Sequence, residues 1–481
     1  MVSVNRTPTP NLRLARLYAA GMVVCTLASA CGNAAPPPPA TGTPSVTVPT
    51  VASTTVSPPV PAVTPAGDFS AVSRLIDDAV AAHRLPGAVV QVGHGGDIVF
   101  RQAFGVRKLV GEPGLDGAPS PAEPMTEDTL FDVASLTKSL ATATAIMQLY
   151  EQGQVQIDAP VQTYLPDFNP ADDPRRAQVT LRMLLTHTSG IAGDLSLDGP
   201  WGLDKADKAD GVRRALAAWV VFGPGERFHY SDINFIILGA LLEKITGESE
   251  DVYVRENVFA PLGMSDTYYL PASKACGPHK VRGTAIVLDP DGPAVRICPP
   301  GTWSTGLLER IAPTALDEDT PGLNPDYGHP LRGTVHDPTA RRMGGVAGSA
   351  GVFTTVHDMG RFAQALLDQL ANRPSTFPLT QASAQVMTTP QQPGPPVPGQ
   401  NVRGFGWDID TPHSGPRGAI FPVGSFGHTG FTGATLWMDP GSDTYVIVLA
   451  NVIHQRGGPP IVALSGQVAT ESARALHLYG S

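Results

Sequence analysis

The sequence predicts an α+β fold in which an antiparallel sheet takes strands from both ends of the chain and a mainly helical region is inserted between them. Two observations lead to this fold class. Short apolar runs bounded by turn residues, which are typical of strands, occur near the beginning and the end of the folded part. Longer apolar segments, typical of buried helices, lie between them, and this order favours a sheet flanked by helices.

The first strands are predicted at 88–92 and 98–104, on either side of a Gly-rich turn, so the folded part opens with a hairpin. The last strands are predicted at 434–438 and 444–450, joined by an Asp-Pro-Gly-Ser turn. Four segments are predicted to be helices: 136–150, 233–245, 358–370 and 461–476.

Residues 1–30 have the pattern of a secretory signal peptide. Three arginines precede an apolar run at 17–30 that is too short to span a bilayer comfortably. Small residues end this run directly before Cys31, as in the lipobox of bacterial lipoproteins, which predicts cleavage before Cys31 and its acylation. The alternative is a plain signal peptide cleaved nearby.

Residues 31–67 are predicted to be the lipidated cysteine and a Pro/Thr-rich tether. From 32 to 67 there is no Asp, Glu, Lys or Arg, and such a segment cannot bury one face against a core. The folded domain is therefore predicted at 68–481. Together these features predict an extracytoplasmic protein that is anchored to the cell membrane through lipid.

The charge balance argues against nucleic acid as a partner. The chain has 33 Lys and Arg residues against 43 Asp and Glu residues, for a formal net charge of -10. No long Lys/Arg run offsets that sign locally. A surface this acidic repels phosphate backbones, which bind through clustered cations.

The cysteines predict one disulfide. Cys25 lies in the leader and Cys31 is the predicted acylation site, which leaves Cys276 and Cys298. In an oxidising compartment this pair is expected to close a loop. A metal-binding pair is the less favoured alternative, because the sequence has neither CxxC nor HExxH, and neither a metal nor an organic cofactor is predicted.

The first candidate catalytic pair is Ser135 and Lys138, at the start of the helix predicted at 136–150. Residues three apart share one face of a helix, so the lysine ammonium can reach the serine hydroxyl. Burial would lower the pKa of the lysine and let it act as a base, while the helix N-terminus would direct N–H groups at an oxyanion. The alternative is a helix cap followed by a solvated lysine.

A second candidate element, Tyr230 and Asp232, stands just before the helix predicted at 233–245. Tyr230 could pass a proton from the nucleophile to a leaving group, and Asp232 could hydrogen-bond the lysine or the substrate. The alternative is that Ser231 or Asp232 only caps the helix.

A third candidate element, His428-Thr429-Gly430, precedes the strand predicted at 434–438. A cationic or polar side chain beside a glycine-bearing strand edge can hold a carbonyl or carboxylate group. The edge also offers N–H groups for β-type pairing with a peptide-like substrate.

In this order, the three elements resemble the motifs of the serine β-lactamase and penicillin-binding-protein superfamily, in the branch with class C β-lactamases, D-alanyl-D-alanine carboxypeptidases and related esterases. The family pattern is S-x-x-K, then Y-x-N, then K/H-T-G, matched here by Ser135/Lys138, Tyr230/Asp232 and His428/Thr429/Gly430. The resemblance covers about 68–476, and the segments 331–337 and 344–348 are similar to the subgroup containing penicillin-binding protein 4B. It implies a β-lactamase/transpeptidase-like fold.

The resemblance also implies a role for each matched residue. Ser135 would be the acylated nucleophile, Lys138 its base and Tyr230 the proton relay. The oxyanion hole would consist of the N–H groups of Ser135 and Phe431. The remaining substrate-binding positions would be Asp232, His428, Thr429 and Gly430.

Two residues depart from the family pattern. Asp232 stands where Asn is commoner, and its negative charge should favour the protonated form of Lys138, which opposes base function. His428 replaces the lysine of class C β-lactamases, as in the peptidase and esterase members, so efficient antibiotic hydrolysis is not expected. The deacylating E-x-x-L-N motif of class A enzymes is also missing.

The predicted function is a serine hydrolase that forms an acyl-enzyme with a D-Ala-D-Ala-type peptide, an ester or a β-lactam. The expected partner is a small-molecule or peptide substrate, with peptidoglycan among the candidates. Two alternatives stay open: a lipoprotein that binds penicillin or peptidoglycan without turnover, and a classical β-lactamase.

A competing interpretation is an α/β-hydrolase. Residues 347–351 around Ser349 resemble a nucleophile elbow, and 94–96 resembles an oxyanion loop. An elbow needs a helix after the serine, whereas 352–353 is strand-like. Elsewhere, His187 is expected to be structural, with its ring bonded to backbone in a turn at a helix end.

Overall fold

A computed structural model describes residues 61–64, 66–289, 291–292, 295, 297–394, 399–454 and 461–481. The predicted signal peptide and Cys31 lie outside these residues, as does most of the predicted tether. Within the described ranges, no helix is long and apolar enough to cross a membrane.

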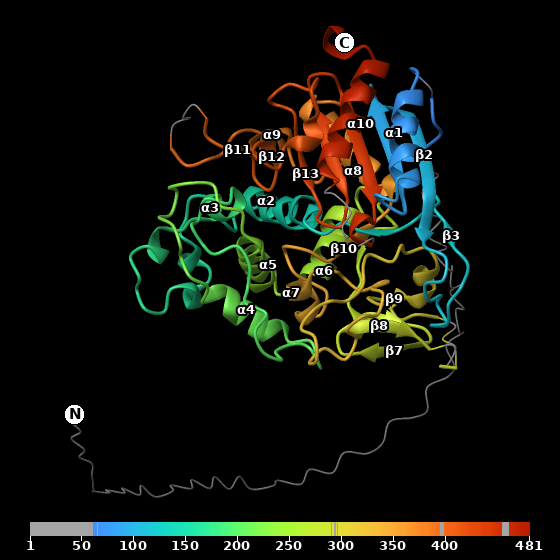
Figure 1. The fold of residues 1–481 in the computed structure, drawn as a ribbon. Coiled ribbons are helices and arrows are strands. Elements are labelled where there is room, and N and C mark those ends of the chain that lie inside the picture. The colour runs from blue at the N-terminus through green and yellow to red at the C-terminus, as the bar shows by residue number, and fades with distance from the viewer. Residues whose placement is uncertain are drawn as a thin grey trace, which may run out of the picture. The chain divides into compact units, whose positions relative to one another are not determined.

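One eight-stranded antiparallel sheet joins the two ends of the folded chain, and its blue and red strands lie side by side in Figure 1. The strand order is β11-β12-β13-β14-β15-β1-β2-β3. In the central pair, Ala88 lies opposite Ala450 and His94 opposite Thr444. The predicted sheet from both chain ends is therefore confirmed. Its strands are β1 (Gly87–His94), β2 (Asp97–Lys108), β3 (Glu123–Pro124), β11 (Val402–Arg403), β12 (Asp408–Asp410), β13 (Phe426–Thr429), β14 (Thr435–Asp439) and β15 (Thr444–Ala450).

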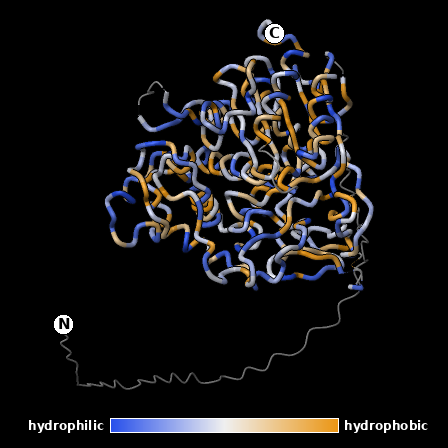
Figure 2. Tube along the Cα trace, in the orientation of Figure 1, coloured by the Kyte–Doolittle hydropathy of each residue, from blue (hydrophilic) through white to orange (hydrophobic). Residues whose placement is uncertain are grey.

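Helices cover both faces of this sheet. Successive strand residues point to opposite faces, so Val90 packs in one core with α1 (Ser70–Ala81) and α10 (Val462–Ala475), while Val89 packs in the other with α8 (Val356–Leu370). Burial on both faces explains why β15 is an almost uninterrupted apolar run. Figure 2 shows these hydrophobic segments in orange along the strands and the helices beside them.

Between β3 and β11 the chain forms the inserted region, which is mainly helical as predicted but also contains three small sheets. Their strands have only two to four residues, too short for an alternating pattern to be recognised. The other α-helices are α2 (Thr144–Glu151), α3 (Leu181–Leu185), α4 (Lys208–Leu216), α5 (Asp232–Thr246), α6 (Glu250–Val254), α7 (Pro338–Arg342) and α9 (Gln381–Thr388). The π-helices are η1 (Lys138–Ala143) and η5 (Arg255–Phe259). The small sheets pair β4 (Phe131–Asp132), β10 (Val352–Thr354) and β5 (Tyr268–Tyr269), then β6 (Ala275–Cys276) with β9 (Trp303–Ser304), and β7 (His279–Arg282) with β8 (Ala285–Leu288).

Helix α5 corresponds to the helix predicted at 233–245 and lies inside the inserted region. Ser231 caps its N-terminus by accepting a hydrogen bond from the Asn234 N–H at 3.3 Å. Gly247 ends it with a φ of 74°, a left-handed conformation that glycine adopts without steric cost. Ser231 therefore caps the helix, as the sequence suggested. This role is compatible with a catalytic role of its neighbours Tyr230 and Asp232.

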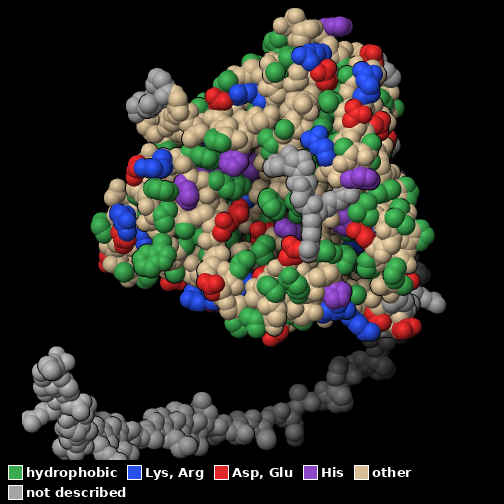
Figure 3. Space-filling model, in the orientation of Figure 1, with side chains coloured by type: hydrophobic (Ala, Val, Ile, Leu, Met, Phe, Trp, Pro, Cys, Tyr) green, Lys and Arg blue, Asp and Glu red, His purple; other side chains and the backbone are tan. Residues whose placement is uncertain are grey.

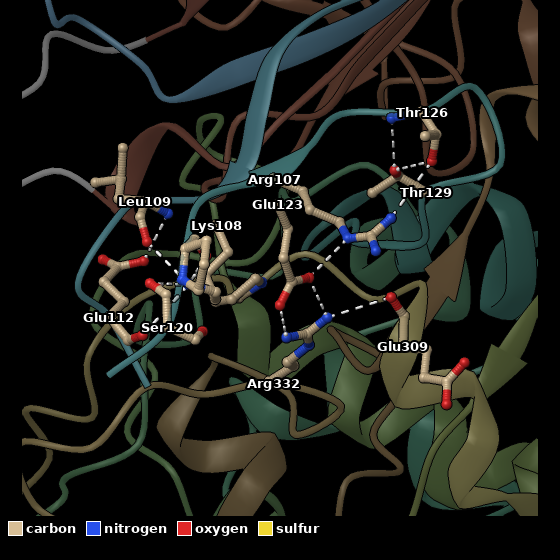
Figure 4. A network of polar contacts seen from close by, with 12 residues as sticks. Arg107, Lys108, Leu109, Glu112, Ser120, Glu123, Thr126, Thr129, Glu309 and Arg332 are labelled. Atoms are coloured by element: carbon tan, nitrogen blue, oxygen red, sulfur yellow. Dashed lines mark hydrogen bonds and ion pairs between the residues drawn. The ribbon is translucent and has the colours of Figure 1, made fainter. Parts of the chain in front are cut away.

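An ion-pair network ties β3 to the inserted region (Figure 4). Glu123 accepts hydrogen bonds from Arg107 at 2.9 Å and from both terminal nitrogens of Arg332, at 2.9 and 2.7 Å. Beside it, the buried Lys108 points into the loop at 109–121 and donates to the backbone carbonyl of Pro121 at 2.8 Å. These contacts fix the edge of the sheet against the segment that leads to α7.

The structure joins Cys276 to Cys298, with a Cα–Cα separation of 5.7 Å. Cys276 belongs to β6, whose parallel partner β9 follows Cys298 in the chain. Formation of this bond in the cell stays a prediction.

Candidate active site

Ser135 and Lys138 lie where β4 passes into the first helix of the inserted region. Ala134, directly before the serine, has a φ of 46°, which is uncommon for a residue with a side chain. The segment predicted as one helix at 136–150 is helical, but its first part is the π-helix η1, a form frequent at functional sites. The Lys138 N–H donates to the Ser135 carbonyl at 3.1 Å, so both residues belong to one turn.

The Lys138 ammonium is fully buried and has three oxygen atoms close to it. It donates to Ser135 Oγ and to the Ser349 carbonyl, both at 2.9 Å, and forms an ion pair with Asp232 Oδ1 at 2.5 Å. Burial by itself lowers the pKa of Lys138, but the charges and hydrogen bonds of Asp232 and Tyr230 outweigh it, so the pKa lies above its ordinary value. Lys138 is therefore protonated in the resting site.

Tyr230 lies next to Lys138. The distance from Lys138 Nζ to the centre of the Tyr230 ring is 5.2 Å. Burial raises the pKa of the Tyr230 hydroxyl, and contacts with Lys138 and Ser135 lower it in part. The ring stacks on His187 at 4.3 Å, and His187 Nδ1 accepts a hydrogen bond from the Ser231 N–H at 3.0 Å. His187 thus holds the tyrosine in place, which agrees with its expected structural role.

His428 of β13 is buried, and its ring lies 6.2 Å from that of Tyr230. Its Nδ1 is 2.8 Å from the Thr429 carbonyl, which can only accept, so Nδ1 carries the proton. Burial, with the charges of Arg403 and Lys138, lowers the pKa of His428 to about 3. His428 is therefore neutral and presents the lone pair of Nε2, so of the two expected kinds of side chain, cationic or polar, it is the polar kind.

The end of β13 packs against the backbone before Ser135. A Cβ on Gly430 would lie 2.3 Å from the Val133 carbonyl oxygen, so only glycine fits there. The Thr432 hydroxyl donates to the Asp132 carbonyl at 2.6 Å and holds the two segments together. In the described part of the chain, neither the Ser135 N–H nor the Phe431 N–H has a hydrogen-bond acceptor, as expected of an oxyanion hole.

Two further carboxyl groups lie near Asp232, and no motif in the sequence points to them. Asp194 follows Gly193, whose carbonyl accepts a hydrogen bond from the Asp232 N–H at 2.8 Å. Asp337 caps α7 by accepting from the Ala340 N–H at 2.6 Å. Desolvation and the charge of Asp232 raise the pKa of Asp194 to about 6 and that of Asp337 to about 7. Three carboxyl groups therefore lie near the ammonium of Lys138, and Asp232 forms the ion pair with it.

The family model described as Beta-lactamase matches residues 72–458, which include every residue placed in this site. The chain belongs to the Beta-lactamase family. It is a serine hydrolase of that family, and its sheet of strands from both chain ends with an inserted helical region is the β-lactamase fold.

Two relatives match this member of the Beta-lactamase family over most of their own length. A "Putative D-alanyl-D-alanine carboxypeptidase" of Escherichia coli (strain K12) is 28% identical over 386 residues, which is 76% of this chain and 77% of that protein. An "N-acetylmuramyl-L-alanine amidase" of Bacillus subtilis (strain 168) is 28% identical over 398 residues, 80% of each protein. Among solved structures, a class C beta lactamase from Rhodobacter sphaeroides covers 84% of this chain and 99% of its own, with a TM-score of 0.56 and 20% identity.

The α/β-hydrolase interpretation is wrong. Ser349 is buried and is followed by strand β10, not by the helix that a nucleophile elbow requires. Its carbonyl instead accepts a hydrogen bond from Lys138. His94 ends β1 at the tip of the β1–β2 hairpin, where its ring contacts Thr444 at 2.9 Å, so 94–96 forms a turn.

Proposed function

We propose that this member of the Beta-lactamase family is an extracytoplasmic hydrolase that forms an acyl-enzyme at Ser135 and cleaves D-Ala-D-Ala-type peptides of peptidoglycan. The contact of 2.9 Å between Lys138 Nζ and Ser135 Oγ is the observation that carries this proposal. It pairs a nucleophile with a base, and the open N–H groups of Ser135 and Phe431 lie on the two segments that meet there.

Acylation requires that Lys138 first loses its proton. The neutral amine then takes the proton of Ser135 Oγ while the oxygen bonds to the substrate carbonyl carbon. The resulting oxyanion accepts hydrogen bonds from the Ser135 and Phe431 N–H groups. Tyr230, in contact with both Ser135 and Lys138, passes a proton to the leaving amine as the amide bond breaks.

Deacylation reverses these roles. A water molecule gives a proton through Tyr230 and Lys138 and adds to the acyl carbon, and the ester bond to Ser135 Oγ breaks as that oxygen regains a proton. The products are a carboxylic acid and the free enzyme. Neither half of the cycle calls for a metal or an organic cofactor.

The neutral His428 favours a second candidate substrate class. A carboxylate beside the scissile bond, as in D-Ala-D-Ala peptides and β-lactams, would gain no charge pairing from His428 and would face Asp232, Asp194 and Asp337. An internal amide has no such carboxylate, and its N–H can donate to His428 Nε2. The N-acetylmuramyl-L-alanine amide, the bond named for the Bacillus subtilis relative, belongs to this class.

A substrate panel on the purified full chain tests these proposals. It compares a D-Ala-D-Ala peptide, an N-acetylmuramyl-L-alanyl peptide, a short-chain p-nitrophenyl ester and nitrocefin. Release of D-alanine as the fastest reaction supports the first class, and cleavage before L-alanine supports the second. Labelling by a fluorescent penicillin without turnover of any substrate would support the non-hydrolytic binding protein, and nitrocefin as the best substrate would support the β-lactamase.

We also propose that the mature protein is a lipoprotein anchored through Cys31, on a tether that ends near residue 67. The support is the sequence pattern around Cys31 alone. Changing Cys31→Ala should release the protein from the membrane fraction or leave it unprocessed. A mature N-terminus far from residue 31 would contradict the anchor. In the same mature protein, two free thiols after unfolding without reductant would contradict the disulfide of Cys276 and Cys298.

A further inference from the structure

A groove of about 610 Å³ lies between the segment at 167–176 and helix α4, away from Ser135. Trp219 stands at its wall and is 81% exposed. No cation and no second aromatic ring contacts its indole among the residues that the structure describes. Large aromatic side chains usually bury most of their surface, and a tryptophan this exposed on the wall of a groove offers a ligand a flat apolar face.

The backbone that carries Trp219 is fixed on both sides. The Trp219 carbonyl accepts from the Ala192 N–H at 3.0 Å, and the carbonyl of Ala218 accepts from Arg176 at 2.6 Å. The Arg176 guanidinium also stacks on the Phe168 ring at 4.1 Å, so Arg176 helps to hold the backbone around Ala218 in place. The indole is thus presented from a rigid position, and a ligand that stacks on it has little backbone to order.

The charged side chains of the groove all have protein partners or lie beside one another: two carboxylates, Asp167 and Asp173, and three guanidiniums, Arg175, Arg176 and Arg213. Arg176 donates to backbone carbonyls, Arg213 pairs with Asp210, and Arg175 lies 3.8 Å from Asp173. Anionic lipid or nucleic acid would require several unpaired cations, whereas each of these guanidiniums already has a partner. An apolar platform with both hydrogen-bond donors and acceptors suits a neutral ligand that has one apolar face and many polar groups, as a sugar ring does.

The backbone that carries Trp219 is linked to the catalytic site through Ala192. Ala192 donates its N–H to the Trp219 carbonyl and accepts, through its own carbonyl, a hydrogen bond from Ser231 Oγ at 2.6 Å. Ser231 stands between Tyr230 and Asp232 in the chain. The wall of the groove is therefore hydrogen-bonded to the segment that supplies Tyr230 and Asp232.

We propose that the Trp219 groove binds N-acylated amino sugars of the glycan chain to which the substrate peptide is attached. The sugar ring stacks on the indole, and its hydroxyl and amide groups pair with the carboxylates and guanidiniums of the groove. This inference rests on the proposed function, because only a peptidoglycan substrate carries both a peptide and such a glycan.

The direct test is binding of the tetrasaccharide of N-acetylglucosamine, a neutral chain of N-acylated amino sugars, measured by calorimetry. The protein is the full chain with Cys31→Ala, which removes acylation. Trp219→Ala should weaken binding about tenfold, since truncating an aromatic anchor commonly costs at least that much. Trp219→Phe, which keeps an aromatic face, should restore part of the affinity. Tyr327→Ala, which removes an exposed ring outside the groove, should bind like the unchanged protein.

A kinetic measurement separates this inference from the proposed function. The ratio of kcat/KM for a glycan-linked stem peptide to that for the free peptide should fall in Trp219→Ala and stay high in Tyr327→Ala. Glycan binding that depends on Trp219 without cleavage of any peptide would refute the proposed function and leave the groove assignment standing. Equal binding of the tetrasaccharide by Trp219→Ala and the parent, or no binding by the parent, would overturn the groove assignment. Binding to phosphatidylglycerol vesicles that is lost in Trp219→Ala would overturn it in favour of a lipid surface.

Discussion

Glu123 and Asp232 have the same side-chain exposure, 22%, but their electrostatic surroundings are opposite. Two cations, Arg107 and Arg332, form ion pairs with the single carboxylate of Glu123 (Figure 4). Burial raises the pKa of Glu123, yet the hydrogen bonds and charges of the two arginines outweigh it and hold the pKa below its ordinary value. This carboxylate stays ionised and connects two parts of the fold.

At Asp232 the ratio of charges is reversed. One ammonium, that of Lys138, pairs with Asp232, and the negative charge of Asp232 raises the pKa of both Asp194 and Asp337. Acidic side chains and histidines also lie close together on the face shown in Figure 3. The lesson is that exposure does not separate a structural carboxylate from one at a reactive site. The local balance of charge does, because unsatisfied charge is what makes a group respond to substrate or pH.

The largest expected effect tests whether the Asp232 region is the reactive one at all. Ser135→Ala removes the atom that forms the covalent bond, so turnover should fall about a million-fold, as when a comparable hydrolase loses its nucleophile. Labelling by a fluorescent penicillin should disappear as well. Both assays are run beside circular dichroism to show that the variant is folded. Labelling that survives in a folded Ser135→Ala protein would place the nucleophile elsewhere.

The next effect tests the reversed charge ratio directly. Asp232→Asn removes the negative partner 2.5 Å from Lys138 Nζ, so the pKa of Lys138 should fall and the amine should be free at lower pH. A charge pair of this kind is worth about 4 kcal/mol at an effective dielectric near 20, before screening. The rising limb of the pH profile of kcat/KM should therefore move about one to three units toward acid. Profiles that coincide for the variant and the parent would disprove the charge argument.

The sequence predicted the parts of the site that lie in short motifs. Ser135 and Lys138 share one turn, and Tyr230 and Asp232 stand at the start of a capped apolar helix, so the spacing placed each pair together and the family resemblance assigned their roles. It also predicted the two hairpins, because the runs at 88–104 and 434–450 show strand composition and clear turns.

What the sequence could not predict depends on tertiary contacts. Asp194 and Asp337 are single acids in loops, and they become part of the site only because Gly193 bonds to the start of α5 and α7 packs nearby. The neutrality of His428 likewise follows from burial and from the charges of Arg403 and Lys138, which are distant from it in the sequence. The π-helical turn at Lys138 has the same apolar pattern as an α-helix, so composition did not distinguish them.

A smaller effect is expected at Glu123, the structural carboxylate, and it concerns the free energy of unfolding. Glu123→Gln should lower the free energy of unfolding by about 2 kcal/mol, because it leaves two mostly buried guanidiniums without their carboxylate. The pH profile of kcat/KM should not shift, since Glu123 does not contact the site. Urea unfolding and the same kinetic assay measure the two expectations. A shifted pH profile would show that the two regions are electrostatically coupled.

The pH dependence of this stability has a definite sign. The pKa of Glu123 is lower in the folded protein than its ordinary value of 4.5, so its contribution is present above that value and is lost as the pH falls through the lowered pKa. Glu123→Gln should remove that acid-side loss. If the variant and the parent lose stability equally on acidification, the arginine pair does not stabilise the fold through this charge.

The smallest expected effect comes from Asp194, a second carboxyl group near Asp232. Its pKa of about 6 in the folded protein lies above the ordinary 3.8, so the folded state holds a proton that the unfolded chain has released. Stability should therefore decline as the pH rises through this window, and Asp194→Asn should remove the decline. The same variant should move the rising limb of kcat/KM toward acid, but by less than Asp232→Asn, because Asp232 rather than Asp194 is in contact with Lys138. Unfolding curves across the window and the pH profile measure both. A larger kinetic shift in Asp194→Asn than in Asp232→Asn would mean that Asp194 is the partner that controls the lysine.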